Sequence, residues 1–249
     1  MSKNAGAGNQ VVGTWAPLSN ITLAAGVLER AMNRSPNLPG IVVFDGPPGY
    51  GKTEAALYCA NKFNGIAVEC RSFFTAKSLM TAILKEAGLV PGRTLSDMMD
   101  QLVEELRLSR RALIVDEVDH IAEAKSLQIL RDIHDAAQCA IMLIGEERLP
   151  QKLQRTERFH SRVLVWQQAS PATERDAQQL ARFYSPGVEI AEDLLKALYK
   201  ASRSVVRRIC VNVDEVREFG QTRGLKKVAL AEWGDKPFYT GEAPARRAA

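Results

Sequence analysis

The chain has 249 residues, of which 46% are hydrophobic and 25% are charged, and its formal net charge is +4. These values are ordinary for a soluble globular protein. No apolar stretch approaches the ~18 residues that a membrane-spanning helix needs, and residues 1–13 lack the apolar region of a secretory signal. We therefore expect a cytoplasmic protein without a membrane partner. The mildly basic charge permits contact with nucleic acid but does not demonstrate it.

The cysteines and histidines predict no metal site made of side chains alone. Cys59, Cys70, Cys139 and Cys210 lie far apart and form no Cys-x-x-Cys pair. Three of them fall within apolar patterns, where buried free thiols are the usual explanation. The three histidines are also isolated, so a structural zinc is not expected.

The first predicted elements surround a glycine-rich loop. Residues 20–33 carry apolar side chains at helical spacing and end at Ser-Pro and Leu-Pro-Gly turns. Residues 41–44 are typical of a buried strand, and residues 54–60 suit a helix. Between that strand and that helix stands a complete Walker A pattern, Gly46-Pro47-Pro48-Gly49-Tyr50-Gly51-Lys52-Thr53.

This order of strand, loop and helix is the one that phosphate binding requires. Glycines let the backbone curl so that successive N–H groups face a phosphate, and the helix N-terminus adds the positive end of its dipole. We expect Lys52 at the β- and γ-phosphates of ATP and the Thr53 hydroxyl at Mg²⁺. The alternative is a Gly/Pro-rich turn that happens to carry Lys-Thr. The flanking elements favour a nucleotide site that extends from Gly46 to Glu54.

Strands and helices alternate along the next hundred residues. The predicted strands are residues 65–70, 112–115, 140–144 and 162–166, and the predicted helices are residues 75–87, 95–108 and 127–137. Either Ser96 or Thr94 is expected to cap the second helix. The alternation predicts a doubly wound α/β fold, with a parallel sheet flanked by helices and ligand bound at the carboxyl ends of the strands.

The composition changes after Trp166. Helical periodicity without a convincing strand predicts a small all-helical domain, with helices at residues 172–184, 191–201 and 205–219. The lysines and arginines near the end of the chain predict a loosely ordered basic tail. The expected organisation is a flexible tail (1–18), a nucleotide-binding α/β domain (19–166), a helical domain (167–225) and the basic tail (226–249).

Residues 113–119 form a Walker B pattern. Asp116 leaves the end of a buried strand beside the P-loop, where an aspartate can hold Mg²⁺ through its water shell. The adjacent Glu117 stands where a general base would polarise the attacking water. The alternative is a strand that ends in an acidic turn, but its pairing with a P-loop favours the nucleotide site. Glu117 favours hydrolysis over nucleotide sensing alone.

These motifs and the helical domain after them resemble the AAA+ ATPases, whose helical domain forms a lid. Four segments further resemble the B-type transposition proteins of Mu-like phages and their bacterial relatives: residues 116–121, 144–150, 157–163 and 206–209. The resemblance runs from about residue 20 to residue 224. It implies ATP and Mg²⁺ as cofactors, in a protein that oligomerises on DNA, chooses target DNA and stimulates a transposase.

The resemblance also implies roles for two arginines. Arg162 matches the arginine finger, a catalytic residue that reaches the γ-phosphate of a neighbouring subunit and neutralises transition-state charge. Arg155 and Arg158 lie nearby, and each of the three is alternatively a solvated surface charge. Arg207 matches sensor 2, the lid arginine that contacts the nucleotide, although periodicity does not choose between Arg207 and Arg208.

At sensor 1 the chain departs from the family pattern. The family usually holds Asn, Thr or Ser after the fourth buried strand to orient water, whereas here Gly145 is followed by Glu146. Either Glu146 takes that catalytic part, or hydrolysis is slow and timed by partners. Alternatively, Glu146 is an ordinary residue in the first turn of a helix.

Contact with DNA is expected from the ATPase core. The phage Mu member carries an added helix-turn-helix domain, and the residues before Asn20 are too few for one. Arg71, Lys77 and Lys85 follow the second strand, in the region that related ring and filament ATPases turn toward DNA. A solvated helix face is the alternative. Binding through these cations would fall steeply with salt and depend little on DNA sequence.

Three functions remain open. The first is an ATP-driven ring or filament on DNA that delivers target DNA to a transposase in a bacterial host cell. The second keeps the ATPase but makes it a helicase loader or replication initiator. The third is a nucleotide-gated binding module that does not hydrolyse ATP.

Overall fold

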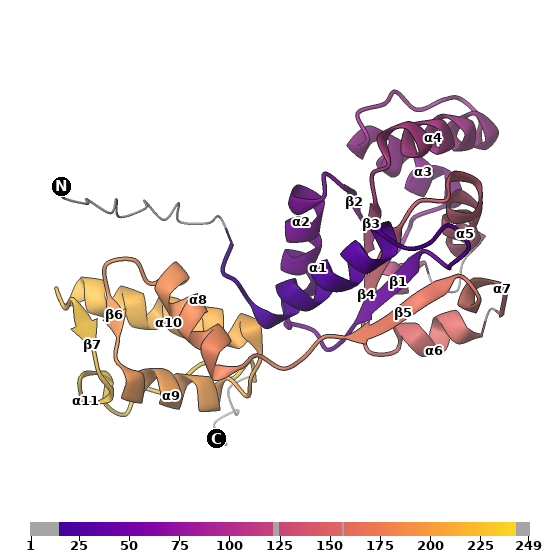
Figure 1. The fold of residues 1–249 in the computed structure, drawn as a ribbon. Helices are drawn as coiled ribbons and strands as arrows, with labels where there is room; N and C mark the ends of the chain where they lie inside the picture. The colour runs from indigo at the N-terminus through magenta and orange to yellow at the C-terminus, as the bar shows by residue number, and fades with distance from the viewer. Residues whose placement is uncertain (1–14, 122–124, 156, 243–249) are drawn as a thin grey trace, which may run out of the picture.

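The computed structural model describes residues 15–121, 125–155 and 157–242 (Figure 1). The first part of the chain alternates between helices and strands. In chain order its elements are α1 (Ser19–Met32), β1 (Ile41–Asp45), α2 (Lys52–Lys62), β2 (Ile66–Glu69), α3 (Ala76–Glu86), α4 (Leu95–Ser109), β3 (Leu113–Asp116), η1 (Val118–His120), α5 (Lys125–Ala137), β4 (Ile141–Gly145), α6 (Leu149–Gln154), α7 (Glu157–His160) and β5 (Val163–Gln168).

The five strands form one parallel sheet in the order β2-β3-β4-β1-β5. Successive side chains of β1 point to opposite faces, so Val42 and Phe44 join one apolar core while Ile41 and Val43 join the other. Helices α1 and α2 cover the first face, and α3, α4 and α5 cover the second. The predicted parallel sheet flanked by helices is confirmed, and β1, which carries the P-loop, lies inside it.

Helix α4 begins at a capping box. The Thr94 hydroxyl accepts a hydrogen bond from the Asp97 N–H at 3.1 Å, and the Asp97 carboxylate accepts one from the Thr94 N–H at 3.0 Å. Each side chain satisfies a backbone donor that the first turn of a helix leaves without a partner. Thr94, rather than Ser96, is therefore the cap.

The remaining elements build the lid: α8 (Glu174–Tyr184), β6 (Glu189–Ile190), α9 (Glu192–Ala201), α10 (Val206–Thr222), β7 (Lys227–Val228) and α11 (Leu230–Trp233). The predicted helical region is present. The expectation that it contains no strand is wrong, because β6 and β7 pair in parallel. Each of these strands has only two residues, too few for any alternation of apolar and polar side chains to be read.

The chain after residue 225 belongs to the lid, so the predicted loosely ordered tail is wrong for residues 226–242. Trp233 is buried, stacks on Phe238 with ring centroids 5.7 Å apart and meets the edge of Phe219. The Asn212 side chain exchanges two hydrogen bonds with the backbone of Tyr239. The contacts with Phe219 and Asn212 of α10 join this segment to residues well before it in the sequence. Residues 243–249 lie outside the described part of the chain.

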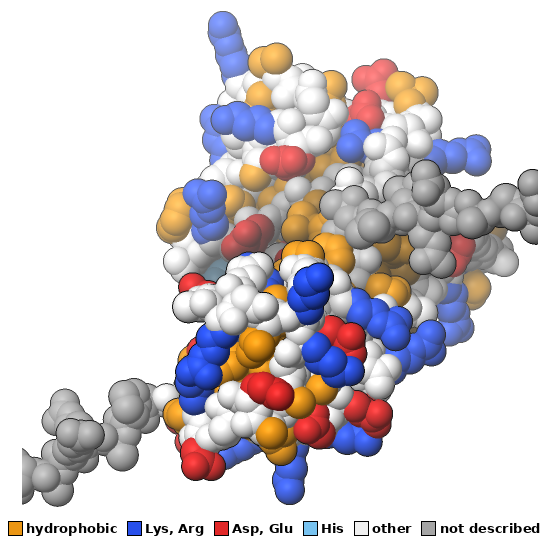
Figure 2. All heavy atoms as spheres, turned by 90° about the vertical axis from the view of Figure 1, so that its left-hand side faces the viewer, with side chains coloured by type: hydrophobic (Ala, Val, Ile, Leu, Met, Phe, Trp, Pro, Cys, Tyr) orange, Lys and Arg blue, Asp and Glu red, His pale blue; other side chains and the backbone are white. Residues whose placement is uncertain are grey.

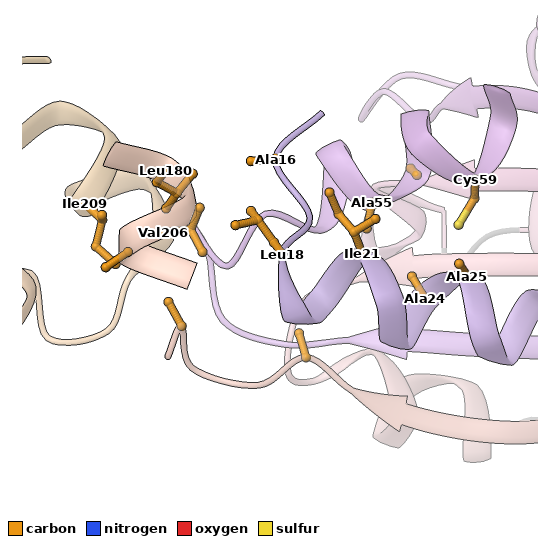
Figure 3. Packing of buried hydrophobic residues seen from close by; sticks show 14 of the residues in the cluster. Ala16, Leu18, Ile21, Ala24, Ala25, Ala55, Cys59, Leu180, Val206 and Ile209 are labelled. Carbon is orange, nitrogen blue, oxygen red and sulfur yellow. The ribbon is translucent and has the colours of Figure 1, made fainter. Parts of the chain in front are cut away.

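The lid and the α/β core share one apolar cluster at the start of α1 (Figure 3). Leu18 and Ile21 lie between the lid residues Leu180 and Val206 on one side and Ala55 of α2 on the other. Leu18 is buried, and so is Ala16, so the predicted flexible tail is wrong at these two positions. Residues 1–14 lie outside the described part. Within the described residues, no helix is both long and apolar enough to span a bilayer.

Candidate functional site

The P-loop joins β1 to α2 through glycines that no other residue replaces without strain. Gly49 has φ 82° and Gly51 has φ 78°, in the left-handed region that favours glycine. A Cβ on Gly49 would also stand 2.9 Å from Cγ1 of Val205, at the start of lid helix α10. A Cβ on Gly46 would stand 2.8 Å from the Cβ of Ala169. The loop is thus curved as phosphate binding requires and enclosed by the chain that follows β5.

A cavity of about 540 Å³ lies in front of this loop, between the core and the lid. Its polar part includes Lys52, Thr53, Glu117, Glu146 and Arg207. Its apolar part is lined mainly by Trp15, Ala16, Leu18, Ile21, Leu180 and Phe183. A pocket of this size with one polar and one apolar part suits a nucleotide, with phosphates at the P-loop and the base among apolar side chains. Trp15, Ala16 and Leu18 were missed because they fall in the predicted tail.

The side chain of Lys52 is hydrogen-bonded to the backbone of the P-loop. Its Nζ donates hydrogen bonds to the carbonyl oxygens of Gly46 at 2.6 Å and Pro47 at 2.9 Å. Burial lowers the pKa of Lys52, and the nearby carboxylates of Glu117 and Asp116 oppose that shift. A phosphate would offer this ammonium group a charged acceptor in place of two neutral carbonyls.

Asp116 and Glu117 stand at the carboxyl end of β3, beside the P-loop helix. Burial raises the pKa of Asp116, although hydrogen bonds from the Thr53 side chain and the Glu117 N–H oppose the shift. Burial and the neighbouring Asp116 raise the pKa of Glu117. Glu117 also has φ 55°, a strained conformation for a residue with a side chain, and such strain concentrates at functional sites. Glu117 lines the cavity, and its role as a general base stays a prediction.

The contact between Thr53 and Asp116 fits a Mg²⁺ site. A hydroxyl and a carboxylate that lie side by side can both turn oxygen atoms to one small cation, and oxygen is the ligand that Mg²⁺ prefers. Among the described residues, no group of three or more His, Cys, Asp and Glu side chains is placed to hold a metal. The other ligands would be phosphate oxygens and water.

Glu146 lines the cavity from the carboxyl end of β4, and Asp119 holds its backbone there. The Asp119 carboxylate accepts hydrogen bonds from the Glu146 N–H at 2.5 Å and from Nζ of Lys152 at 3.1 Å. A Cβ on Gly145 would stand 2.2 Å from the same carboxylate, which explains the glycine. Asp119 is the last residue of the Walker B pattern at residues 113–119, and the sequence assigns it no role. Its spacing from Asp116 was the only signal.

Of the two arginines proposed for sensor 2, Arg207 lines the cavity, together with Glu54 of the P-loop helix. Its N–H also donates to the Gly49 carbonyl at 3.0 Å, so the start of α10 touches the P-loop directly. The guanidinium of Arg208 lies instead beside Gly241. The contact of Arg207 with a nucleotide stays a prediction.

Arg162 lies at the far end of the sheet from the P-loop. Its carbonyl accepts from the N–H of Ile41 at the start of β1, whereas the P-loop follows the end of β1. Its guanidinium makes two hydrogen bonds to the Asp135 carboxylate, at 3.1 and 3.0 Å. Arg162 is thus not placed to reach phosphates bound by its own chain. The side chain of Arg158 lies outside the described residues.

The three predicted DNA contacts lie outside the cavity, on the surface after β2. Arg71, Lys77 and Lys85 are exposed, and Nζ of Lys77 donates to the Arg93 carbonyl. Figure 2, which faces the lid, shows basic and acidic side chains interspersed on that side. Much of the net positive charge comes from Lys3, Arg246 and Arg247, outside the described part. DNA contact by the three residues stays a prediction.

Residues 37–153 match the family model of the AAA domain. The fold is similar to the Orc1 protein of Aeropyrum pernix in complex with DNA (20% identity, TM-score 0.60), covering 84% of this chain and 61% of that one. It is also similar to Cdc6p of Pyrobaculum aerophilum, with 16% identity and a TM-score of 0.59, covering 89% of this chain and 66% of that one. A further similar structure is the RuvB Holliday junction branch migration motor of Thermotoga maritima, with 19% identity and a TM-score of 0.58, covering 84% of this chain and 64% of that one. The chain spans under two thirds of the length of each. No curated protein sequence matches it.

Asp45 is a buried acid at the point where β1 passes into the P-loop. The residue is 1% exposed, and neither carboxylate oxygen has a hydrogen-bond partner within the part of the chain that the structure describes. Burial raises its pKa from 3.8 to about 6, while Lys52 opposes the shift and Asp119 and Glu147 add to it. Sequence reasoning missed Asp45 because the strand before it reads as uniformly apolar.

We predict that Asp45→Asn stabilises the α/β core at neutral pH and not in acid. The folded chain binds the Asp45 proton more tightly than the unfolded chain does, so ionisation opposes folding. The wild type therefore loses stability as the pH rises from about 4 through about 6. At pH 7.5 the variant should gain about 1–3 kcal/mol in the free energy of unfolding.

Denaturant unfolding between pH 4 and 8 measures this difference. Asp100→Asn, at an exposed position on α4, is the matched control and should follow the wild type. A constant difference between Asp45→Asn and the wild type across that range would contradict the prediction.

Proposed function

We propose that this chain is a Mg²⁺-dependent ATPase that self-associates on DNA, with ATP as the switch for assembly. The observation that best supports it is the convergence of Lys52, Thr53 and Glu117 on one cavity, with Asp116 beside Thr53 at the end of β3. The cavity has the size and the two-part character that a nucleotide needs. The match of residues 37–153 to the AAA domain supports the same function.

In this proposal each residue has a separate task. Lys52 and the P-loop N–H groups bind the β- and γ-phosphates, and Thr53 and Asp116 hold Mg²⁺. Bound Mg²⁺ supplies neutralisation of the phosphate charge. Glu117 accepts a proton from the attacking water, a role that its raised pKa suits because a stronger base accepts the proton more readily. Glu146 faces the same cavity and orients water or senses the phosphate.

We predict that Glu117→Gln binds ATP but releases phosphate about 10²–10⁴-fold more slowly than the wild type, because the amide cannot accept the proton. Lys52→Ala should lose ATP binding itself. Phosphate release with and without DNA, together with equilibrium ATP binding, separates these two defects. Glu104→Gln, at an exposed site on α4, controls for the change of charge.

The main alternative is a binding module that does not hydrolyse ATP. It predicts that the wild type binds ATP and releases no phosphate above background, even with DNA and Mg²⁺. That result would contradict the ATPase and leave only the nucleotide switch.

The position of Arg162 supports self-association. Because Arg162 and the P-loop lie at opposite ends of the sheet, its guanidinium can serve only a nucleotide bound by another copy. Its pairing with Asp135 is partly exposed, with 38% and 40% of the two side chains accessible. Exposed ion pairs contribute little free energy, so a neighbouring γ-phosphate can replace Asp135 as the partner of Arg162.

We predict that Arg162→Ala and Glu117→Gln are each inactive alone but recover hydrolysis when mixed. In the mixture, an Arg162→Ala subunit keeps Glu117 and receives the intact arginine of its Glu117→Gln neighbour. Arg162→Ala alone should lose about 10³-fold or more in rate. Arg30→Ala, at an exposed arginine of α1, should hydrolyse normally. A mixture no more active than its components would contradict a finger supplied by a neighbour.

The DNA-related role has two versions. The segments that resemble the B-type transposition proteins support delivery of target DNA to a transposase, with stimulation of its activity, in the cytoplasm of a bacterial host. The likeness of the fold to Orc1 in complex with DNA and to Cdc6p favours an initiator or helicase loader as the second candidate. Stimulation of strand transfer by a transposase separates the first role from deposition of a helicase on DNA, which indicates the second.

We predict ATP-dependent DNA binding that weakens steeply with salt and depends little on DNA sequence. Each phosphate contact that is lost should reduce the slope of log affinity against log salt by about 0.9 for duplex DNA. The combined variant Arg71→Ala, Lys77→Ala, Lys85→Ala tests the surface after β2 by titration at several salt concentrations. An unchanged slope would exclude these three residues as the contacts.

A further inference from the structure

Asn20, the second residue of α1, is a buried amide with every hydrogen-bonding group in use. It is 4% exposed. Its Nδ2 donates to the carbonyl oxygens of Tyr50 at 2.9 Å and Ser170 at 2.8 Å, and its Oδ1 accepts from the Ser170 N–H at 2.8 Å. One side chain therefore joins the first helix, the P-loop and the chain that leads into the lid.

The segment held by Asn20 is the link between core and lid. Ser170 lies after β5 and before α8. The N–H of Ala169 donates to the Asp45 carbonyl at 2.7 Å, and the N–H of Ala172 donates to the Ser204 carbonyl at 2.9 Å. The link is thus tied to β1 just before the P-loop, to Asn20, and to the loop that starts lid helix α10.

The lid holds the P-loop from the other side. The Arg207 N–H donates to the Gly49 carbonyl, so the carbonyls of Gly49 and Tyr50, adjacent in the chain, are held by the lid and by Asn20 respectively. A trans peptide group is planar, with its C=O and N–H pointing in opposite directions. Fixing these two carbonyls therefore also fixes where the N–H groups of Tyr50 and Gly51 point.

We propose that Asn20 is a positioning residue that couples the P-loop peptides to the position of the lid. The inference rests on the proposed nucleotide site, because the N–H groups in question are those that a phosphate would bind. When the loop adjusts to a phosphate, the Tyr50 carbonyl turns with its peptide. Asn20 passes that movement to Ser170, and the link carries it to α10. Nucleotide binding and lid position thereby change together.

Asp176 provides a matched control at the same junction. It is 3% exposed and accepts hydrogen bonds from the Ser19 N–H at 2.8 Å and the Thr173 N–H at 2.7 Å. It therefore ties α1 to α8 as Asn20 ties α1 to the link, but none of its hydrogen bonds reaches the P-loop. A residue that only fastens the lid to the core should behave like Asp176.

The test compares Asn20→Asp with Asp176→Asn in the full chain. Asn20→Asp keeps the acceptor for Ser170 but places a carboxylate oxygen against two carbonyl oxygens. We expect both variants to melt at a lower temperature than the wild type. Of these two variants, Asn20→Asp should weaken binding of a non-hydrolysable ATP analogue by about tenfold and Asp176→Asn should not, because only Asn20 is hydrogen-bonded to the P-loop. Asn20→Ser, a gentler change that keeps a hydroxyl, should be intermediate.

Hydrogen exchange with and without the analogue gives the second readout. In the wild type, the analogue should alter exchange in the P-loop, in residues 169–173 and in the first turn of α10 together. In Asn20→Asp the change should stay in the P-loop. Normal affinity and a normal exchange response in both Asn20 variants would overturn the coupling alone. A wild type that binds no analogue would overturn the nucleotide site, and the coupling with it.

Discussion

The direction of a few peptide groups in the P-loop governs the rest of this structure. Gly49 and Gly51 adopt positive φ angles, which curve the loop, and the carbonyl groups of residues 49 and 50 are bonded from behind by Arg207 and Asn20. The N–H groups of the same two peptides, those of residues 50 and 51, are donors whose direction matters, because a hydrogen bond weakens steeply once it bends. The junction of core and lid holds this direction in place, and that junction is buried.

Electrostatics sets the second constraint. Asp116, Glu117 and Glu146 surround Lys52, so the site carries more carboxylates than a polyphosphate would tolerate without a counter-charge. In the proposed function, a divalent cation held by Thr53 and Asp116 would supply this counter-charge, which a single lysine does not. Burial is the first cause of the raised pKa of Glu117, and the neighbouring carboxylate of Asp116 adds to it.

The parallel sheet was predictable from the sequence because its strands are continuous apolar runs, and the P-loop was predictable because its residues are adjacent in the chain. Asn20, Asp45 and Asp119 were not predictable as site residues, since their partners lie 27 to 150 positions away or, for Asp45, are absent from the described residues. The strands β6 and β7 were missed because two residues show no period. Local sequence patterns therefore predict the P-loop and the strands, whereas the residues that pack around the P-loop depend on contacts distant in sequence.

The ion pair between Arg162 and Asp135 has a consequence for how copies of this chain would separate. When an arginine leaves a neighbour's phosphate, its guanidinium must find new hydrogen-bond acceptors, in water or on the protein. In this structure, the Asp135 carboxylate accepts two hydrogen bonds from the Arg162 guanidinium, so it provides an acceptor on the same chain. Assembly and disassembly then become an exchange of one anionic partner for another. Such an exchange keeps the energy difference between the two states small, which is what a reversible assembly requires.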